Sequence, residues 1–127
     1  MPNQFTDVPG PSLDDFETYK TLKTYQYYGN NIILDRVGCT VFCTCIGSNY
    51  NSASANSYLR DANNNVLPVI PTGYRPTHIV DVKDNLASKR LQLAKDSSGW
   101  RFITTEALSS AVLRFSCCWV TEDDYPT

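Results

Sequence analysis

The residues that could do chemistry are few, and they do not form a catalytic set. The one histidine, His78, follows a turn and precedes a predicted strand. A serine or cysteine nucleophile needs a nearby base that a third group orients, and the chain has no G-x-S-x-G turn. Two acidic pairs, Asp14 with Asp15 and Asp123 with Asp124, could suggest a glycosidase, but adjacent side chains usually point apart. We therefore expect no enzyme activity and no cofactor.

Five cysteines occur inside two hydrophobic runs: Cys39, Cys43, Cys45, Cys117 and Cys118. Their odd number argues against a disulfide framework, and without any C-x-x-C spacing a zinc or iron–sulfur site has no support. Alternation along a strand would place the first three on one face with Val37 and Val41. The sequence therefore predicts no metal site, but reduced thiols that pack as small core hydrophobes in a protein folded in a reducing cytoplasm.

A candidate ligand site lies around a predicted hairpin. Trp100 directly follows the turn Ser97-Ser98-Gly99, and an aromatic surface beside polar groups suits the apolar faces of sugar rings. Arg90 and Gln92 share one face of the preceding strand, and both can hydrogen-bond hydroxyl or phosphate groups. The predicted ligand-binding residues are Arg90, Gln92 and Trp100. The alternative is a solvated strand face beside a tryptophan buried in the core or in a subunit interface.

The elements that must position these residues are short strands separated by turns. Loops are predicted at 47–56, 61–65, 71–76 and 96–99, a hairpin turn at 35–38, and a short helix is suggested over 12–17. Such spacing, without any βαβ rhythm, is typical of a β-sandwich or barrel. Strands are expected over 18–28, 32–46, 58–60, 78–83, 90–94, 100–104 and 111–120, with Leu91, Leu93, Leu113, Phe115 and Trp119 facing inward.

Charge and hydropathy exclude other classes of partner. The net charge is −2, and the 11 Lys and Arg residues are scattered, so we expect no binding to nucleic acid. No run approaches the roughly 20 apolar residues of a membrane-spanning helix, and the first ten residues lack the pattern of a secretory signal. The sequence therefore predicts no membrane insertion.

The aromatic content suggests self-association. Phe, Trp and Tyr make up 12% of the chain, which is more large apolar surface than one small sandwich easily hides. Burial between symmetric copies removes such an exposed patch. Phe42 and Ile46 fall on the strand face opposite Val41 and Cys43, and they are the predicted subunit-interface residues.

Four stretches, in order, resemble the receptor-binding head, tail-fibre or baseplate appendage domains of long-tailed phages of Gram-positive bacteria. The Ile70–Thr77 stretch, which reads IPTGYRPT, is the most specific of them. The others are a glycine-led hydrophobic strand with a following Arg-x-Gly, a Ser-Ser-Gly hairpin and a Tyr-Pro ending, found at 29–41, 97–99 and 119–126.

The resemblance implies an all-β, jelly-roll-like antiparallel β-sandwich over residues 25–127 that forms a homotrimer and binds a host cell-wall saccharide. Residues 1–24 would be a linker, a short helix or the remnant of a neck that contacts other baseplate or tail proteins. The protein would be made in the host cytoplasm and reside at the phage tail tip. Strand 90–94 lacks the His-x-Asp with which some of these heads hold sugar. Two alternatives stay open, a purely structural trimerisation or decoration domain and an unrelated β-sandwich adhesin module.

Overall fold

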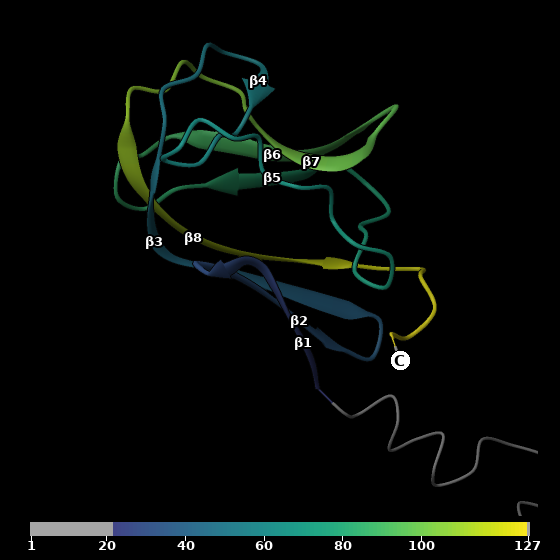
Figure 1. Ribbon diagram of the computed structural model, residues 1–127. Helices are drawn as coiled ribbons and strands as arrows, with labels where there is room; N and C mark the ends of the chain where they lie inside the picture. Colours follow the sequence, from purple (N-terminus) through teal and green to yellow (C-terminus); the bar gives the residue numbers. More distant parts are fainter. Residues whose placement is uncertain (1–21, 127) are drawn as a thin grey trace, which may run out of the picture.

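The computed structural model describes residues 22–126, and within that range all regular secondary structure is β-strand. The strands form two antiparallel four-stranded sheets that lie as two layers (Figure 1). This confirms the all-β prediction. The first sheet has the order β1-β2-β3-β8, formed by Lys23–Asn30, Ile32–Val37, Thr40–Tyr50 and Ala111–Val120. The second sheet has the order β4-β7-β6-β5, formed by Ser57–Tyr58, Gly99–Thr104, Arg90–Asp96 and Val80–Lys83.

The core lies between the two sheets. Phe102 of β7 contacts two aromatic rings of the first sheet, with centroids 5.8 Å from Tyr27 and 5.7 Å from Phe115. Such tilted ring pairs contribute beyond the apolar area they bury. The predicted inward positions are confirmed, since each of them is buried: Leu91, Leu93, Leu113, Phe115 and Trp119.

The two sheets differ in how their strands are connected. In the second sheet, β5, β6 and β7 follow each other through hairpins, and β4 lies beside β7. This is the strand order of a Greek key, read from the C-terminal end. In the first sheet β1, β2 and β3 form a meander, and β8 returns to pair with β3. The last strand therefore closes onto a strand far away in the sequence.

The hairpin between β2 and β3 turns later than the sequence suggested. Val37 pairs with Thr40, so the loop is Gly38-Cys39 and not residues 35–38. Gly38 has a φ of 60°, a conformation that glycine adopts at little cost. The turn interrupts the alternation, so the prediction that Cys39 and Val37 share the buried face was wrong. Val37 and Cys39 are both exposed. Cys43, which lies on β3 beyond the turn, is buried.

Strand β3 also runs further than expected. A loop was predicted from Gly47 because the segment is rich in Gly, Ser and Asn, but β3 continues to Tyr50. The pairing with β8 shifts between Cys45 and Ser48 and then resumes, as at a β-bulge. Gly47, with a φ of 108°, allows this irregularity. The suggested helix over 12–17 and nearly all of the 1–24 linker lie outside the described residues.

Candidate functional site

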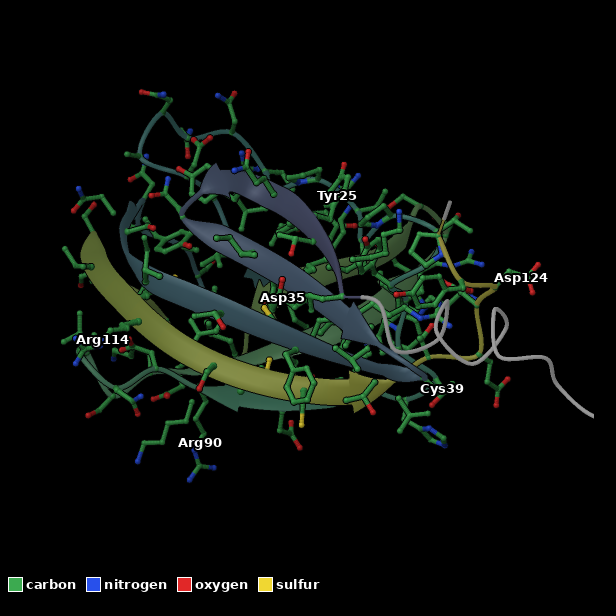
Figure 2. All side chains as sticks on the ribbon, turned by 90° about the horizontal axis from the view of Figure 1, so that it is seen from below. Tyr25, Asp35, Cys39, Arg90, Arg114 and Asp124 are labelled. Atoms are coloured by element: carbon green, nitrogen blue, oxygen red, sulfur yellow. The ribbon has the colours of Figure 1, made fainter. Side chains whose placement is uncertain are left out.

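The outer face of the first sheet carries exposed apolar side chains among polar ones. Among residues 22–126, ten large hydrophobic side chains are exposed, and half of them project from this face. Figure 2 looks onto the sheet, with Asp35 in the middle of its surface. We term this surface the apolar face; its exposed hydrophobic residues are Val37, Phe42, Ile46, Val112 and Val120.

The two predicted interface residues lie on the apolar face. Phe42 is 47% exposed and Ile46 is 59% exposed, although both side chains are large and apolar. Two charges accompany them, Asp35 on β2 and Arg114 on β8. The Asp35 carboxylate accepts a 2.7 Å hydrogen bond from the Thr24 hydroxyl. A surface of this composition is typical of a protein contact.

The outer face of the second sheet is more polar. The strand register places Tyr58, Ile103, Gln92 and Asp81 in one row across β4, β7, β6 and β5. Within this row the Gln92 side-chain amide donates a 2.9 Å hydrogen bond to the Asp81 carboxylate. Arg90 lies two residues before Gln92 on the same side of β6. We term this surface the polar face.

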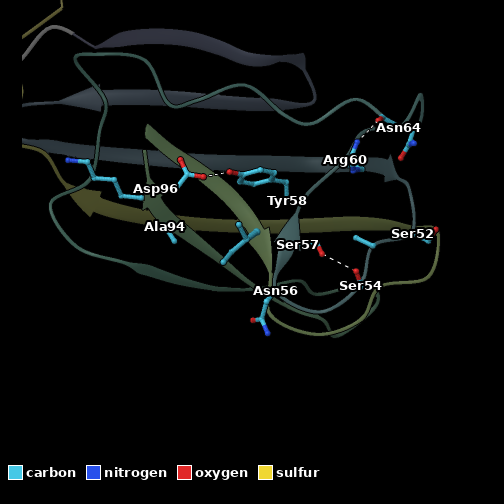
Figure 3. Close-up of a pocket in the computed structure, with 12 residues that line it drawn as sticks. Ser52, Ser54, Asn56, Ser57, Tyr58, Arg60, Asn64, Ala94 and Asp96 are labelled. Carbon is cyan, nitrogen blue, oxygen red and sulfur yellow. Dashed lines mark hydrogen bonds between the residues drawn. The ribbon is translucent and has the colours of Figure 1, made fainter. Parts of the chain in front are cut away.

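A groove of about 650 Å³ opens beside β4 (Figure 3). The loop between β3 and β4 forms one wall, and Ala94, Asp96 and Ile103 of the polar face form another. The loop is held to β7 because the Asn56 backbone N–H donates a 2.7 Å hydrogen bond to the Thr104 carbonyl. We term this cavity the polar groove. Hydroxyl and amide side chains dominate its lining: Ser52, Ser54, Asn56, Ser57, Tyr58 and Asn64.

Tyr58 is the aromatic residue of the polar groove, and its ring is held in place. Its hydroxyl donates a hydrogen bond to the Asp96 carboxylate, as Figure 3 shows. The Arg101 guanidinium lies over the ring, 5.5 Å from its centroid. Tyr58 lines the groove and Arg101 does not, so the ring contributes an aromatic surface to the groove.

The electrostatics around Asp96 fix this arrangement. Hydrogen bonds from Ser98 and from the Tyr58 hydroxyl lower the pKa of Asp96 to about 2. The same carboxylate raises the pKa of Tyr58. Near neutral pH Asp96 is therefore ionised and accepts the hydrogen bond, while Tyr58 is neutral and donates it.

The predicted ligand residues do not all come together. Arg90 and Gln92 line a second hollow on the polar face, and Gln92 pairs directly with Ile103 of the polar groove. Trp100 instead pairs with Lys95, on the side of β7 that carries Phe102. There it packs against the core and lines a separate hollow.

Sequence reasoning missed the residues that build the polar groove. Tyr58 was expected in a short strand, but nothing in the sequence shows that β4 pairs with β7, which places Tyr58 opposite Ile103, 45 positions further along the chain, and brings Tyr58 to Asp96. The available signal was the Ser- and Asn-rich loop directly before it. Such residues can donate and accept hydrogen bonds at a groove.

The described residues show neither a metal site nor a membrane-spanning helix. Over residues 22–126 no three His, Cys, Asp or Glu side chains gather where they could hold a metal ion. In the same part of the chain no helix is long and apolar enough to cross a membrane. Comparison with known proteins gives no family: no protein-family model matches the sequence, and no curated protein matches it.

Proposed function

We propose that this chain is a receptor-binding domain of a phage tail appendage, which attaches the virion to cell-wall saccharides of its host. In this proposal the domain is a jelly-roll-like sandwich that works as a homotrimer at the tail tip. The observation that carries the proposal is the contrast between its two outer faces. One sheet exposes five large apolar side chains on its outer face, and the other exposes a polar groove with one aromatic ring.

The chemistry of the polar groove supports a saccharide ligand. Sugar hydroxyls need donors and acceptors in equal measure, and the Ser and Asn side chains of the groove supply both. The apolar side of a sugar ring needs a flat surface, which Tyr58 offers. The Asp96 carboxylate already accepts hydrogen bonds from Tyr58 and Ser98. The groove therefore suits a hydroxyl-rich ligand, and Arg60 and Lys95 in its lining can also contact acidic groups of a wall polymer.

The apolar face supports assembly of identical copies. Its two charges have opposite sign and lie on different strands, Asp35 on β2 and Arg114 on β8. Where one copy contacts the next through different edges of this face, the two charges can pair across the boundary. Such head-to-tail contacts close into rings, of which a trimer is one. The Greek-key order of the second sheet is compatible with a jelly roll.

The proposal is tested by sedimentation with bacterial cell walls. The probe is a panel of protein-free cell walls from Gram-positive bacteria that differ in their wall polysaccharides. We expect the wild-type protein to sediment with some of them. Tyr58→Ala should weaken binding about tenfold, the effect of removing an aromatic hot-spot side chain. Tyr25→Ala is the matched control, because Tyr25 is also an exposed tyrosine but lies outside the groove, and it should bind as the wild type does.

Two outcomes would count against this function. Equal binding by Tyr58→Ala and the wild type would remove the polar groove as the saccharide site. Failure of the wild type to bind any wall, together with stable assembly in solution, would favour the purely structural domain, for which the apolar face alone is sufficient.

A further inference from the structure

Two cysteines face each other across the first sheet. Cys43 of β3 and Cys117 of β8 are direct partners in the strand register, and the neighbouring Cys117 thiol, together with burial, raises the pKa of Cys43. Cys43 is buried, and Cys117 is partly exposed at the edge of the core. The pair therefore joins a protected thiol to one that a small reagent in solvent can reach.

The backbone separation of the pair suits a disulfide. The Thr121 N–H donates a hydrogen bond to the Cys39 carbonyl, which marks that position of the ladder as a hydrogen-bonded pair. Such pairs alternate along antiparallel strands, so Cys43 and Cys117, four residues along each strand, form another one. Their Cα atoms are then about 5.5 Å apart, within the range of about 4.4–6.8 Å that disulfides span.

The other cysteines are placed less well for pairing. Cys118 lies on the opposite face of β8, where its partner is Phe42. Cys39 lies in the exposed hairpin turn. Cys45 lies across from Phe115, and its thiol contacts the Tyr50 hydroxyl at 3.4 Å. The fold therefore selects one pair among the five thiols.

We infer that Cys43 and Cys117 are a redox-modification site, which closes into a reversible cross-strand disulfide when the protein meets a low-molecular-weight disulfide such as oxidised glutathione. The Cys117 thiolate attacks one sulfur of the oxidant and releases one glutathione thiolate. The Cys43 thiol then loses its proton and attacks the Cys117 sulfur, which expels the second glutathione. Two protein thiols are oxidised, and one glutathione disulfide is reduced to two thiols.

The bond would connect β3 to β8 and enclose most of the chain. A cross-link over such a long segment restricts the unfolded state strongly. Side chains at directly opposite positions have Cβ atoms about 4.5–5.5 Å apart, somewhat wider than the roughly 3.5–4.5 Å of a relaxed disulfide. Strained disulfides are reduced more easily, so the bond should open in mild reductant. This inference does not depend on the proposed function.

The test uses the full chain carrying Cys39→Ser and Cys118→Ser, which removes the two exposed thiols. The protein is incubated with oxidised glutathione, denatured, alkylated and digested with trypsin. We expect a cross-link between peptide 37–60, which holds Cys43 and Cys45, and peptide 115–127, which holds Cys117. The melting temperature should rise by about 10 °C and return to its starting value in dithiothreitol.

Two further variants show which thiols form the disulfide. In the same background Cys45→Ala should keep the cross-link, whereas Cys117→Ser should lose it and leave its remaining thiols open to alkylation. Cys117 is only partly buried, so the serine is expected to fold. Persistent glutathione on Cys117 without any cross-link would overturn the inference, and so would loss of the cross-link in the Cys45→Ala protein.

Discussion

The Asp84 carboxylate accepts a 2.6 Å hydrogen bond from the backbone N–H of Arg114, 30 positions further along the chain. Asp84 directly follows β5 of the second sheet, and Arg114 lies in β8 of the first. The same carboxylate accepts hydrogen bonds from the N–H groups of Leu86 and Ala87, and the Asn85 N–H donates to the Arg114 carbonyl. One buried side chain therefore joins the edges of the two sheets.

Removal of this carboxylate should destabilise the domain. Asp84→Ala leaves three backbone N–H groups without their acceptor, at a cost of about 1–3 kcal/mol for each that stays buried. We expect a loss of about 3 kcal/mol in the free energy of unfolding, measured by urea denaturation. Asp81→Ala is the control. Asp81 is exposed and bonded to Gln92, so its loss should cost less than about 1 kcal/mol. Similar values for both variants would contradict the role of Asp84.

Acid should weaken the same connection. Burial opposes ionisation of Asp84, but the N–H groups of Arg114, Leu86 and Ala87 outweigh it, so the pKa lies below its usual 3.8. A carboxyl with a depressed pKa in the folded state stabilises the protein above its unfolded pKa, and that contribution is lost as the pH falls through the folded value. The free energy of unfolding should therefore drop below about pH 4. Measured from pH 6 to 2.5, the decline should be shallower for Asp84→Ala than for the wild type. Parallel curves would show that Asp84 does not titrate in this way.

Arg36 holds the C-terminal segment. Its guanidinium is buried, donates to the carbonyls of Gly38, Gly73 and Asp124 at 2.7–3.0 Å, and lies 5.1 Å from the centroid of the Tyr125 ring. Arg36→Met should lower the free energy of unfolding by about 3 kcal/mol, because it removes charge-assisted hydrogen bonds and leaves buried carbonyls unpaired.

The same change should expose the chain end to carboxypeptidase. Arg60→Met is the control for both measurements, because the Arg60 guanidinium donates to the Asn64 carbonyl at a site away from the C-terminal segment. Equal rates of C-terminal trimming in the wild type and Arg36→Met would mean that Arg36 does not hold the segment in place.

Local pattern predicted much of this fold. Alternation and turn residues lie within a few positions of each other in the sequence. From them we predicted strand 111–120, the hairpin at 96–99 and the inward positions of β6. The face of Phe42 followed in the same way, because Val41 and Cys43 point inward on either side.

Long-range pairing set the limits of prediction. Three features depend on register with a partner strand: the turn at Gly38-Cys39, the bulge after Cys45, and the placement of Trp100 and Gln92 on opposite sides of the sheet. A register shift of one residue moves a side chain to the opposite face. The polar groove needs Tyr58 and Asp96, which come together only in the folded domain.

A charge on the apolar face should separate assembly from folding. Phe42→Lys places a cation opposite Asp35, its cross-strand partner, so the monomer should lose little stability. Burial of that cation between copies would be costly, so the assembly should dissociate. Ile79→Lys is the matched control, because Ile79 is 59% exposed but lies outside the apolar face, and it should assemble normally. Loss of assembly only together with unfolding would contradict this expectation.

We propose that the apolar face joins three identical copies. The most direct test of this trimer is the solution mass of the wild-type protein, measured by light scattering at several concentrations. We predict a mass three times that of the 14.3 kDa chain, stable across concentrations and reduced by Phe42→Lys. A monomer at every concentration would contradict the trimer and with it the phage-appendage function, and it would favour an unrelated β-sandwich binding module.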